Sequence, residues 1–568
     1  MPFLVTILAN KSNSYGISRD VEGLYTIFAS RGYTVCVRDP LEPPTYTDVA
    51  IHLEIPIHVW MPWAHKNILV VNPEWYIPSS WDSYLKRFDT VIVKDLNTAK
   101  NFPQEIVKVV RWGLPARRFV PRTLKDEFIW ALGASVNKRA YVPTLVKAWK
   151  PTYPRLVIST TTPLEISVPA NVSIVVKDFT AEERAEYFGG FKGHVCCSRA
   201  EGFGYTAAEA ESIGAFTILN SLPCYVESYG NDENVAFIPS KMENAYYDMG
   251  ASPGALEEAL DLAMEAFASY SDKQHDSRID ASLKRWEQFA VAMAGIIVPA
   301  ERPVALARLP PVLDASTAPQ ISIVTLLYNR KRFFDLACHS IMVSDYPKDK
   351  IEWIIVDDSD DVAEQASDRI MAVAETSAPL RLVYVPLKKK TPVSVKRNIG
   401  TAKATADIVL IMDDDDHYPE TSFRRRVAWL TMHPWKPRAV AATTIACYDL
   451  LNGISAVNCP PMDIPLAQRI SEATLTFYKS WWEERGFPTG VVVGEGEEFL
   501  KGREGDLLEI PPQQIIVAFS HGKNVSSRRV PSDTDVTPGC FWGFPKEFLE
   551  FIHRLAGVTV TDTVECQS

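Results

Sequence analysis

Short apolar segments alternate with amphipathic segments along most of this chain, and this alternation restricts the possible folds more than any other feature. The apolar segment at 3–9, for example, is followed by a helical pattern at 20–32 and by a second apolar segment at 33–39. Strands that alternate with helices form parallel sheets with helices on both faces. The sequence therefore predicts an α/β fold, with strands of the first half at 3–9, 33–39, 90–95, 128–134, 155–160, 172–178 and 193–198.

A proline-rich segment at 299–320 interrupts this alternation. It holds five prolines and no apolar period, which is typical of an extended linker, and a new apolar strand begins at Ile321. At 568 residues the chain is also too long for a single hydrophobic core. We therefore expect parallel-sheet domains at 1–115 and 116–298, a linker at 299–320, a third domain at 321–530 and a C-terminal extension at 531–568.

Composition excludes several classes of protein. A net charge of −11, with only short and isolated basic runs, argues against binding to a nucleic-acid backbone. Nine cysteines without C-x-x-C spacing indicate reduced thiols, so we expect a cytoplasmic protein, in the host cytoplasm if the source is a virus. No apolar stretch reaches the ~18 residues that a transmembrane helix needs. The N-terminal segment is interpreted as a first strand rather than a signal peptide.

Two apolar strands of the second half end in carboxylates. The segment 351–361 ends its apolar run at Asp357 and Asp358, and the segment 407–416 runs into four consecutive aspartates. An isolated acidic run is most often a solvated loop. The carboxyl ends of parallel strands, however, meet at one edge of the sheet, where open α/β sheets bind ligands. Two acidic strand ends in one sheet therefore predict a site for a ligand with hydroxyl groups and a metal-bound diphosphate.

Three separated segments, at 321–330, 354–361 and 394–420, together resemble the inverting family-2 glycosyltransferases of the GT-A fold. The resemblance covers roughly 320–525 and implies transfer from a UDP- or GDP-sugar with Mn²⁺ or Mg²⁺. It implies a DxD pair in which Asp415 binds the metal ion and Asp413 lies toward the ribose as a second ligand, with His521 as a further ligand. The residues that it implies around the donor are Thr325, Tyr328, Asp357, Lys396 and Arg397.

The same resemblance places the catalytic base in an "ED" motif downstream. The segment 494–503 reads "GEGEEFLKGR", so Gly496 stands at the usual Asp. A carboxylate must take the proton of the acceptor hydroxyl. Glu495, at the first position of the motif, is the first candidate, and Glu497 and Glu498 are next in line. The alternative is that these residues only form an acidic helix start, stabilised by the helix dipole.

In the first half, Glu201 and Glu209 stand eight positions apart around the segment "EGFG". The two glycines allow the backbone to approach a ligand, and the following helix can direct free N–H groups at phosphate. The segment 196–219 resembles the E-x7-E motif of retaining GT-B glycosyltransferases related to family 4. Thr206 and Glu209 also have the spacing of a helix capping box, which requires no substrate. Both interpretations stay open on spacing alone.

Two neighbouring segments favour the first of these interpretations. The segment 132–149 resembles the strand, loop and helix that supply a diphosphate-binding cation, here Lys138 with Arg139 beside it. The segment 67–76, with Asn72 and Glu74, resembles the acceptor-side domain of some of these enzymes. The resemblance covers roughly 1–260 and implies that Lys138 meets the diphosphate and Glu209 the ribose, without a metal ion. It places Glu201, as a catalytic candidate, and the backbone of Gly202, Phe203 and Gly204 against the transferred sugar.

The two resemblances together imply a bifunctional glycosyltransferase. Its GT-B-like pair of Rossmann-type domains would precede a GT-A-like domain, and both modules would build one glycan on an oligosaccharide or glycoprotein acceptor. The alternative is that one module has lost catalysis and serves as a glycan-binding or scaffolding domain. The departure at Gly496 makes the C-terminal module the candidate for that loss.

Overall fold

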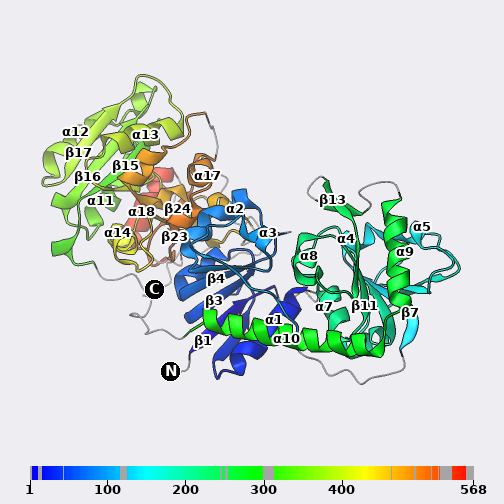
Figure 1. Ribbon diagram of the computed structural model, residues 1–568. Coiled ribbons are helices and arrows are strands. Elements are labelled where there is room, and N and C mark those ends of the chain that lie inside the picture. The colour runs from blue at the N-terminus through cyan, green and yellow to red at the C-terminus, as the bar shows by residue number, and fades with distance from the viewer. Residues whose placement is uncertain are drawn as a thin grey trace. The chain divides into compact units, whose positions relative to one another are not determined.

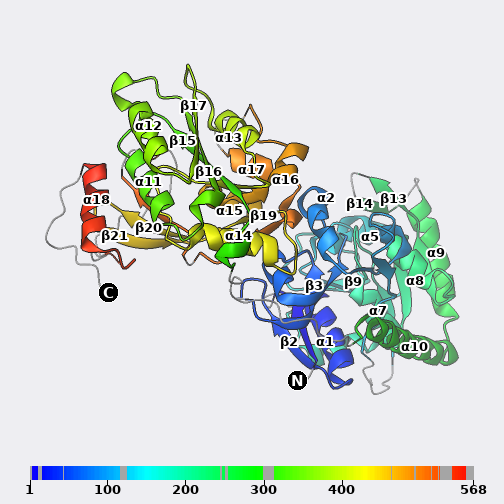
Figure 2. The same cartoon turned by 90° about the vertical axis from the view of Figure 1, so that its left-hand side faces the viewer.

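The computed structural model describes residues 3–10, 16–42, 44–73, 75–115, 124–243, 246–249, 254–298, 313–461, 464–490, 494–512, 514–521, 524, 540 and 542–557. Three parts of the chain lie outside this set: Glu74, the linker residues 299–312, and the predicted extension 531–568 except for 540 and 542–557. The chain divides into two compact units (Figures 1 and 2). Unit 1 comprises Met1–Trp81 and Leu85–Pro303, and unit 2 comprises Asp82–Tyr84 and Val304–Ser568.

Unit 1 contains two six-stranded sheets, and every strand pair in them is parallel. The first sheet has the order β2-β1-β3-β4-β5-β6 and the second the order β12-β11-β10-β7-β8-β9. The strands of the first sheet are β1 (Leu4–Leu8), β2 (Thr34–Arg38), β3 (Thr47–Glu54), β4 (Ala64–Val71), β5 (Thr90–Val93) and β6 (Val107–Val109). Those of the second are β7 (Lys125–Gly133), β8 (Leu156–Thr160), β9 (Val172–Val176), β10 (Phe191–Val195), β11 (Phe216–Asn220) and β12 (Val235–Ile238).

The long helix α10 (Asp272–Ile296) connects the two sheets of unit 1, as Figure 1 shows. Near its start, Arg278 donates a hydrogen bond to the carbonyl of Asn234 beside the second sheet, at 2.9 Å. Near its end, Phe289 and Met293 are buried in the core of the first sheet. The end of α10 therefore packs in the first domain, although its residues follow the second domain in the sequence.

The remaining helices of unit 1 surround these sheets, and a hairpin of β13 (Ser240–Glu243) and β14 (Tyr246–Met249) projects beside them. The helices are α1 (Gly16–Ala29), α2 (Pro78–Trp81), α3 (Leu96–Ala99), α4 (Val136–Arg139), α5 (Val142–Ala148), α6 (Ala181–Phe188), α7 (Tyr205–Ser212), α8 (Pro223–Tyr229) and α9 (Ala255–Ala268).

Unit 2 is built on a seven-stranded mixed sheet with the order β17-β16-β15-β18-β22-β19-β23. The first four strands in this order are parallel, and β22 pairs antiparallel with both β18 and β19. The strands are β15 (Ile321–Leu327), β16 (Ile351–Asp357), β17 (Arg381–Pro386), β18 (Ile408–Ile411), β19 (Ala439–Ala441), β22 (Thr476–Tyr478) and β23 (Leu507–Glu509).

Both faces of this sheet are covered. Ile323 and Ile355 belong to one buried cluster and Val324 and Ile354 to another, because successive side chains of a strand point to opposite faces. A small sheet, β21 (Ile454–Asn458), β20 (Ile445–Asp449) and β24 (Val517–Ser520), packs beside it. The helices are α11 (Phe334–Val343), α12 (Ser367–Thr376), α13 (Val393–Lys403), α14 (Ser422–Met432), α15 (Leu466–Arg469), α16 (Lys479–Glu484), α17 (Glu495–Leu500) and α18 (Lys546–Ala556).

The described part of the predicted C-terminal extension packs on the small sheet. Figure 2 shows α18 beside β20 and β21. Ile552 and Phe548 of α18 are buried with Tyr448 and Phe519. Two parallel sheets in unit 1 and a mixed sheet in unit 2 confirm the predicted fold class, a GT-B-like pair of Rossmann-type domains followed by a GT-A-like domain. Among the described residues, no helix combines the length and the apolar character that crossing a membrane requires.

Candidate active sites

The acidic run of unit 2 lies in the turn after β18, at the carboxyl edge of the mixed sheet. Carboxylate oxygens of Asp413, Asp415 and Asp416 lie within 4.8 Å of one another. His521, just after β24, brings its Nε2 to 3.0 Å from Oδ2 of Asp415. The structure therefore gathers the three predicted metal-binding residues and adds Asp416, which the DxD pattern did not include. Oxygen ligands with one imidazole suit Mn²⁺ or Mg²⁺.

Arg330, which follows β15, is the cation nearest to this cluster in the described structure. Its Nη1 lies 2.6 Å from Oδ2 of Asp415 and 3.2 Å from Oδ1 of Asp414. Burial and the neighbouring Asp415 raise the pKa of Asp414 to about 8. Burial also acts to raise the pKa of Asp415, but the hydrogen bond from His521 and the charge of Arg330 outweigh it, so that this pKa is lowered. Asp415 is therefore the carboxylate of this pair that stays ionised.

The end of β16 brings two further carboxylates to the same edge. Asp357 is buried and accepts hydrogen bonds from the hydroxyl of Tyr384 at 3.1 Å and the backbone N–H of Ser359 at 2.9 Å. Asp358 forms an ion pair with Lys396, with Nζ 2.6 Å from Oδ1. The Lys396 ammonium also lies 5.9 Å from the ring centre of Tyr328. Lys396 and Tyr328 therefore lie together beside the acidic strand end, as predicted, while the partner of Lys396 is Asp358.

The structure does not bring Thr325 to this site. Its side chain is fully buried, and its hydroxyl accepts a hydrogen bond from the indole N–H of Trp353 at 3.0 Å. The reason is the alternation of side chains along β15, which directs Thr325 into the core shared with Trp353.

The predicted base candidates lie at the start of α17. Oε1 of Glu495 is 2.8 Å from Nη1 of Arg397, a residue of α13 that was predicted beside the donor. Oε1 of Glu497 accepts a hydrogen bond from the side-chain amide of Gln468 at 2.8 Å. Glu495 is therefore neutralised by a guanidinium, whereas Glu497 is bound by a neutral group.

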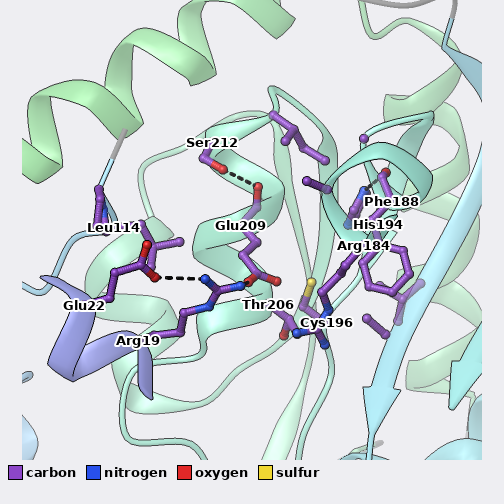
Figure 3. Close-up of a pocket in the computed structure, with 16 residues that line it drawn as sticks. Arg19, Glu22, Leu114, Arg184, Phe188, His194, Cys196, Thr206, Glu209 and Ser212 are labelled. Atoms are coloured by element: carbon purple, nitrogen blue, oxygen red, sulfur yellow. Dashed lines mark hydrogen bonds and ion pairs between the residues drawn. The ribbon is translucent and has the colours of Figure 1, made fainter. Parts of the chain in front are cut away.

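Unit 1 has a pocket between α1, α6, α7 and the strands β7 and β10 (Figure 3). Charged and apolar side chains line it together. They include Arg19, Glu22, Ala131, Arg184, Phe188, His194, Cys196, Thr206, Glu209 and Ser212.

Glu209 lies in this pocket and takes no part in a helix cap. The N-cap residue of α7 is Gly204, at φ +83°, and it makes no side-chain capping bond. The hydroxyl of Thr206 instead accepts a hydrogen bond from Nζ of Lys138 at 3.2 Å. The capping-box interpretation of Thr206 and Glu209 is therefore wrong. Oε1 of Glu209 lies 3.6 Å from Nη2 of Arg19 (Figure 3).

The structure brings some of the other predicted residues of unit 1 together and leaves Arg139 apart from them. Lys138 lies 3.5 Å from Glu201, so the structure places these two together. Gly202 is close to the first sheet, because a Cβ there would lie 2.8 Å from Oδ1 of Asn72. Arg139 instead bonds to Thr160, at 2.8 Å.

Phe203 was predicted to contribute its backbone. Its ring is buried in the apolar core of the first sheet. No motif indicated Arg19, Arg184 or Arg330, because their positions depend on contacts between segments far apart in the sequence.

Comparison with known proteins gives a family match for part of unit 2. Residues 322–435 match the family model described as Glycosyl transferase family 2. This match covers the strands that carry the acidic cluster and supports a relationship of this part of unit 2 to the glycosyltransferases. No protein of curated function matches the chain.

Three solved structures illustrate the structural similarity. A mannosyltransferase from Pyrobaculum calidifontis, PcManGT, in complex with GDP-Man and Mn²⁺, is 20% identical, with a TM-score of 0.30, over 38% of this chain and 60% of its own. TarS 1-349 from S. aureus in complex with UDP-GlcNAc is 18% identical, with a TM-score of 0.29, over 35% of this chain and 58% of its own. Sucrose-phosphate synthase from Thermosynechococcus elongatus is 14% identical, with a TM-score of 0.40, over 52% of this chain and 98% of its own. The chain thus spans about three fifths of the first two structures.

Proposed function

We propose that the protein is a bifunctional glycosyltransferase that adds two sugars to one growing glycan. Unit 2 transfers with inversion and depends on Mn²⁺ or Mg²⁺, and unit 1 transfers with retention and without a metal ion. Both units use UDP- or GDP-sugars, and the acceptor is an oligosaccharide or a glycoprotein. The observation that carries the proposal is the carboxylate cluster of Asp413, Asp415 and Asp416, gathered within 4.8 Å at the carboxyl edge of a sheet.

In unit 2 the metal ligands are these carboxylates and His521. A divalent ion bound there supplies charge stabilisation for the leaving diphosphate. Asp357 and Tyr328, at the adjacent strand ends, hold the nucleoside, and Lys396 and Arg397 flank the donor. Arg330 neutralises Asp415 before the donor enters, since its guanidinium already lies 2.6 Å from that carboxylate.

In unit 1 the pocket beside α7 receives the nucleotide. Glu209 accepts hydrogen bonds from the ribose hydroxyls, and Lys138 with the N-terminal turn of α7 meets the diphosphate. Glu201, beside Lys138, and the backbone at 202–204 contact the transferred sugar. The cation and the oriented N–H groups stabilise the leaving group in the place of a metal ion.

The compartment and the domain boundaries are part of the same proposal. The free, buried thiols of Cys196 and Cys197 suit a reducing compartment, which supports a cytoplasmic location. We place the boundaries at 115/116, 298/299, 320/321 and 530/531, and the division of the chain near residue 303 supports the second and third of these.

Nucleotide release from a panel of UDP- and GDP-sugars tests the proposal on the full chain. We expect two activities, one abolished by EDTA or by Asp415→Ala and the other insensitive to both. The loss of both activities on chelation would contradict the metal-free mechanism of unit 1. A protein that binds nucleotide in unit 2 without any EDTA-sensitive release would favour the alternative, a C-terminal module that binds glycans without catalysis, for which the glycine at 496 is the supporting observation.

A further inference from the structure

The space beside Gly496 is occupied by a carboxylate from another segment. A Cβ on Gly496 would lie 2.3 Å from Cγ and 2.4 Å from Oε1 of Glu472, closer than real Cβ contacts come. The backbone of Gly496 itself would accept a side chain, because Gly496 is a helical residue of α17 and is absent from the residues with positive φ. A side chain at 496 would therefore have to displace the side chain of Glu472.

Glu472 lies at the same edge of the sheet as the acidic cluster. It begins a short 3₁₀ turn, Glu472–Thr474, directly before β22. Because β22 runs antiparallel to β18, the start of β22 lies beside the end of β18, where the aspartates follow. A hydrogen-bonded chain makes this connection explicit: the N–H of Asp413 donates to the hydroxyl of Tyr418 at 2.9 Å, and that hydroxyl donates to the carbonyl of Ala473 at 3.1 Å.

The binding partners of the neighbouring carboxylates distinguish Glu472 from them. Glu495 is bound by the guanidinium of Arg397 at 2.8 Å, so a cation already occupies its carboxylate. Glu497 accepts a hydrogen bond from Gln468. Among the described residues, no cation lies within ion-pair distance of Glu472, and its side chain is only partly buried, so that a ligand can reach it.

We propose that Glu472 is the catalytic base of unit 2 and that its carboxylate takes the place of a side chain at position 496. The inference deepens the proposed function of unit 2 and rests on it. The oxygen of the acceptor hydroxyl forms the new bond to the anomeric carbon of the donor sugar. The bond from that carbon to the diphosphate oxygen breaks, its electron pair leaves with the nucleoside diphosphate, and the proton of the hydroxyl passes to Glu472.

The experiment uses the full chain and water as the acceptor. GDP-mannose, UDP-glucose and UDP-GlcNAc are each supplied with Mn²⁺, and the EDTA-sensitive release of nucleotide is measured. Removing a general base costs about 100-fold or more in rate, so Glu472→Gln is expected to lower this release by that factor. Affinity for GDP or UDP with Mn²⁺, measured by calorimetry, is expected to stay within about twofold, because the base acts on the acceptor.

A carboxylate swap provides the sharper test. In Glu472→Ala combined with Gly496→Asp, the new side chain enters the vacated space, and we expect at least tenfold more release than from Glu472→Ala alone. Glu484→Gln is the matched control, since Glu484 ends α16 and pairs with Arg438 at 2.5 Å with its side chain 56% exposed. Its release is expected to equal that of the wild type.

Three results would overturn the inference. The first is release by Glu472→Gln within about threefold of the wild type, and the second is loss of release in Glu497→Gln but not in Glu472→Gln. The third is a wild type that binds nucleotide with Mn²⁺ but releases none, because water would use a competent base beside the donor. Failure of the proposed function looks different, since nucleotide and Mn²⁺ would then not bind to unit 2 at all.

Discussion

The substitution Arg330→Ala tests whether this guanidinium stands in for a metal ion in the acidic cluster. Arg330 contacts Asp414 and Asp415 at 3.2 and 2.6 Å, and the side chains of these aspartates are only 6% and 11% exposed. Removal of Arg330 leaves buried carboxylates without their nearest described cation. A divalent ion can replace that charge, so we expect the stability of the variant to depend on metal far more than that of the wild type.

The magnitude follows from the burial of the pair. Breaking a buried ion pair costs about 3–5 kcal/mol, and the 22% exposure of the Arg330 side chain lowers our expectation to about 2–3 kcal/mol. For a unit of this size, that loss corresponds to a fall in melting temperature of roughly 4–12 °C in EDTA. Mn²⁺ at 100 times its dissociation constant returns about 2.7 kcal/mol, which is most of the loss.

The assay is thermal unfolding of the full chain, followed in EDTA and in Mn²⁺. Lys331→Ala serves as the matched control, because Lys331 pairs at 2.9 Å with Asp368, whose side chain is 66% exposed. That surface pair is worth about 0–1 kcal/mol and is expected to be insensitive to Mn²⁺. If the melting temperature of Arg330→Ala fell equally in EDTA and in Mn²⁺, the idea that Arg330 and the metal ion neutralise the same carboxylates would be refuted.

Three further predictions concern unit 1. Glu209→Gln is expected to weaken the binding of UDP or GDP, measured by calorimetry without Mn²⁺, by roughly 10- to 150-fold, because it removes a charge-assisted hydrogen bond. The melting temperature is expected to stay unchanged, because Glu209 does not cap α7. Unchanged affinity would show that Glu209 does not belong to the donor site. Lys138→Ala is expected to weaken the same binding and to leave the EDTA-sensitive release of unit 2 as it is, and an equal loss in both units would contradict this separation. Burial lowers the pKa of His52 and of His194 to about 4, below the usual 6.5, so between these pH values the unfolded chain binds more protons than the folded chain. The melting temperature of unit 1 is therefore expected to fall as the pH is lowered from 6.5 toward 4. A melting temperature that does not change over this range would be inconsistent with neutral buried imidazoles.

The predicted strands of the first half correspond to β1, β2, β5, β7, β8, β9 and β10, whereas β3, β4, β6, β11 and β12 were not predicted. For β3 the reason is that Asp48 and His52 interrupt its apolar pattern. In the structure both are buried and satisfied: Asp48 accepts a hydrogen bond from the N–H of Leu4 at 2.7 Å, and His52 bonds to Asn67 at 3.0 Å. The path of α10 could not be predicted either, since an amphipathic pattern does not indicate which of two sheets a helix covers.

The candidate sites show the same limit at the level of single residues. Consecutive carboxylates after a strand predicted the cluster at Asp413 and Asp415, because the chain itself brings them together. Thr325 and Phe203 also lie in motif segments, yet the alternation of a strand and the packing of a turn direct them into cores. Arg19 and Arg330 reach their sites from other elements, and no local spacing carries that information.

The base of unit 2 brings these limits together. A motif specifies a residue at one position of the sequence, whereas proton transfer requires only a carboxylate at the right point in space, from whichever segment it comes. In this chain the volume that a side chain at 496 would fill already holds the side chain of Glu472, which a larger residue at 496 would have to displace. Loss of the expected aspartate therefore does not imply loss of the carboxylate. For the same reason, Gly496→Asp alone is expected to crowd two acidic side chains into one space and to destabilise unit 2. Glu472→Ala should relieve that destabilisation. The effects of the two substitutions on the free energy of unfolding are therefore expected to be non-additive.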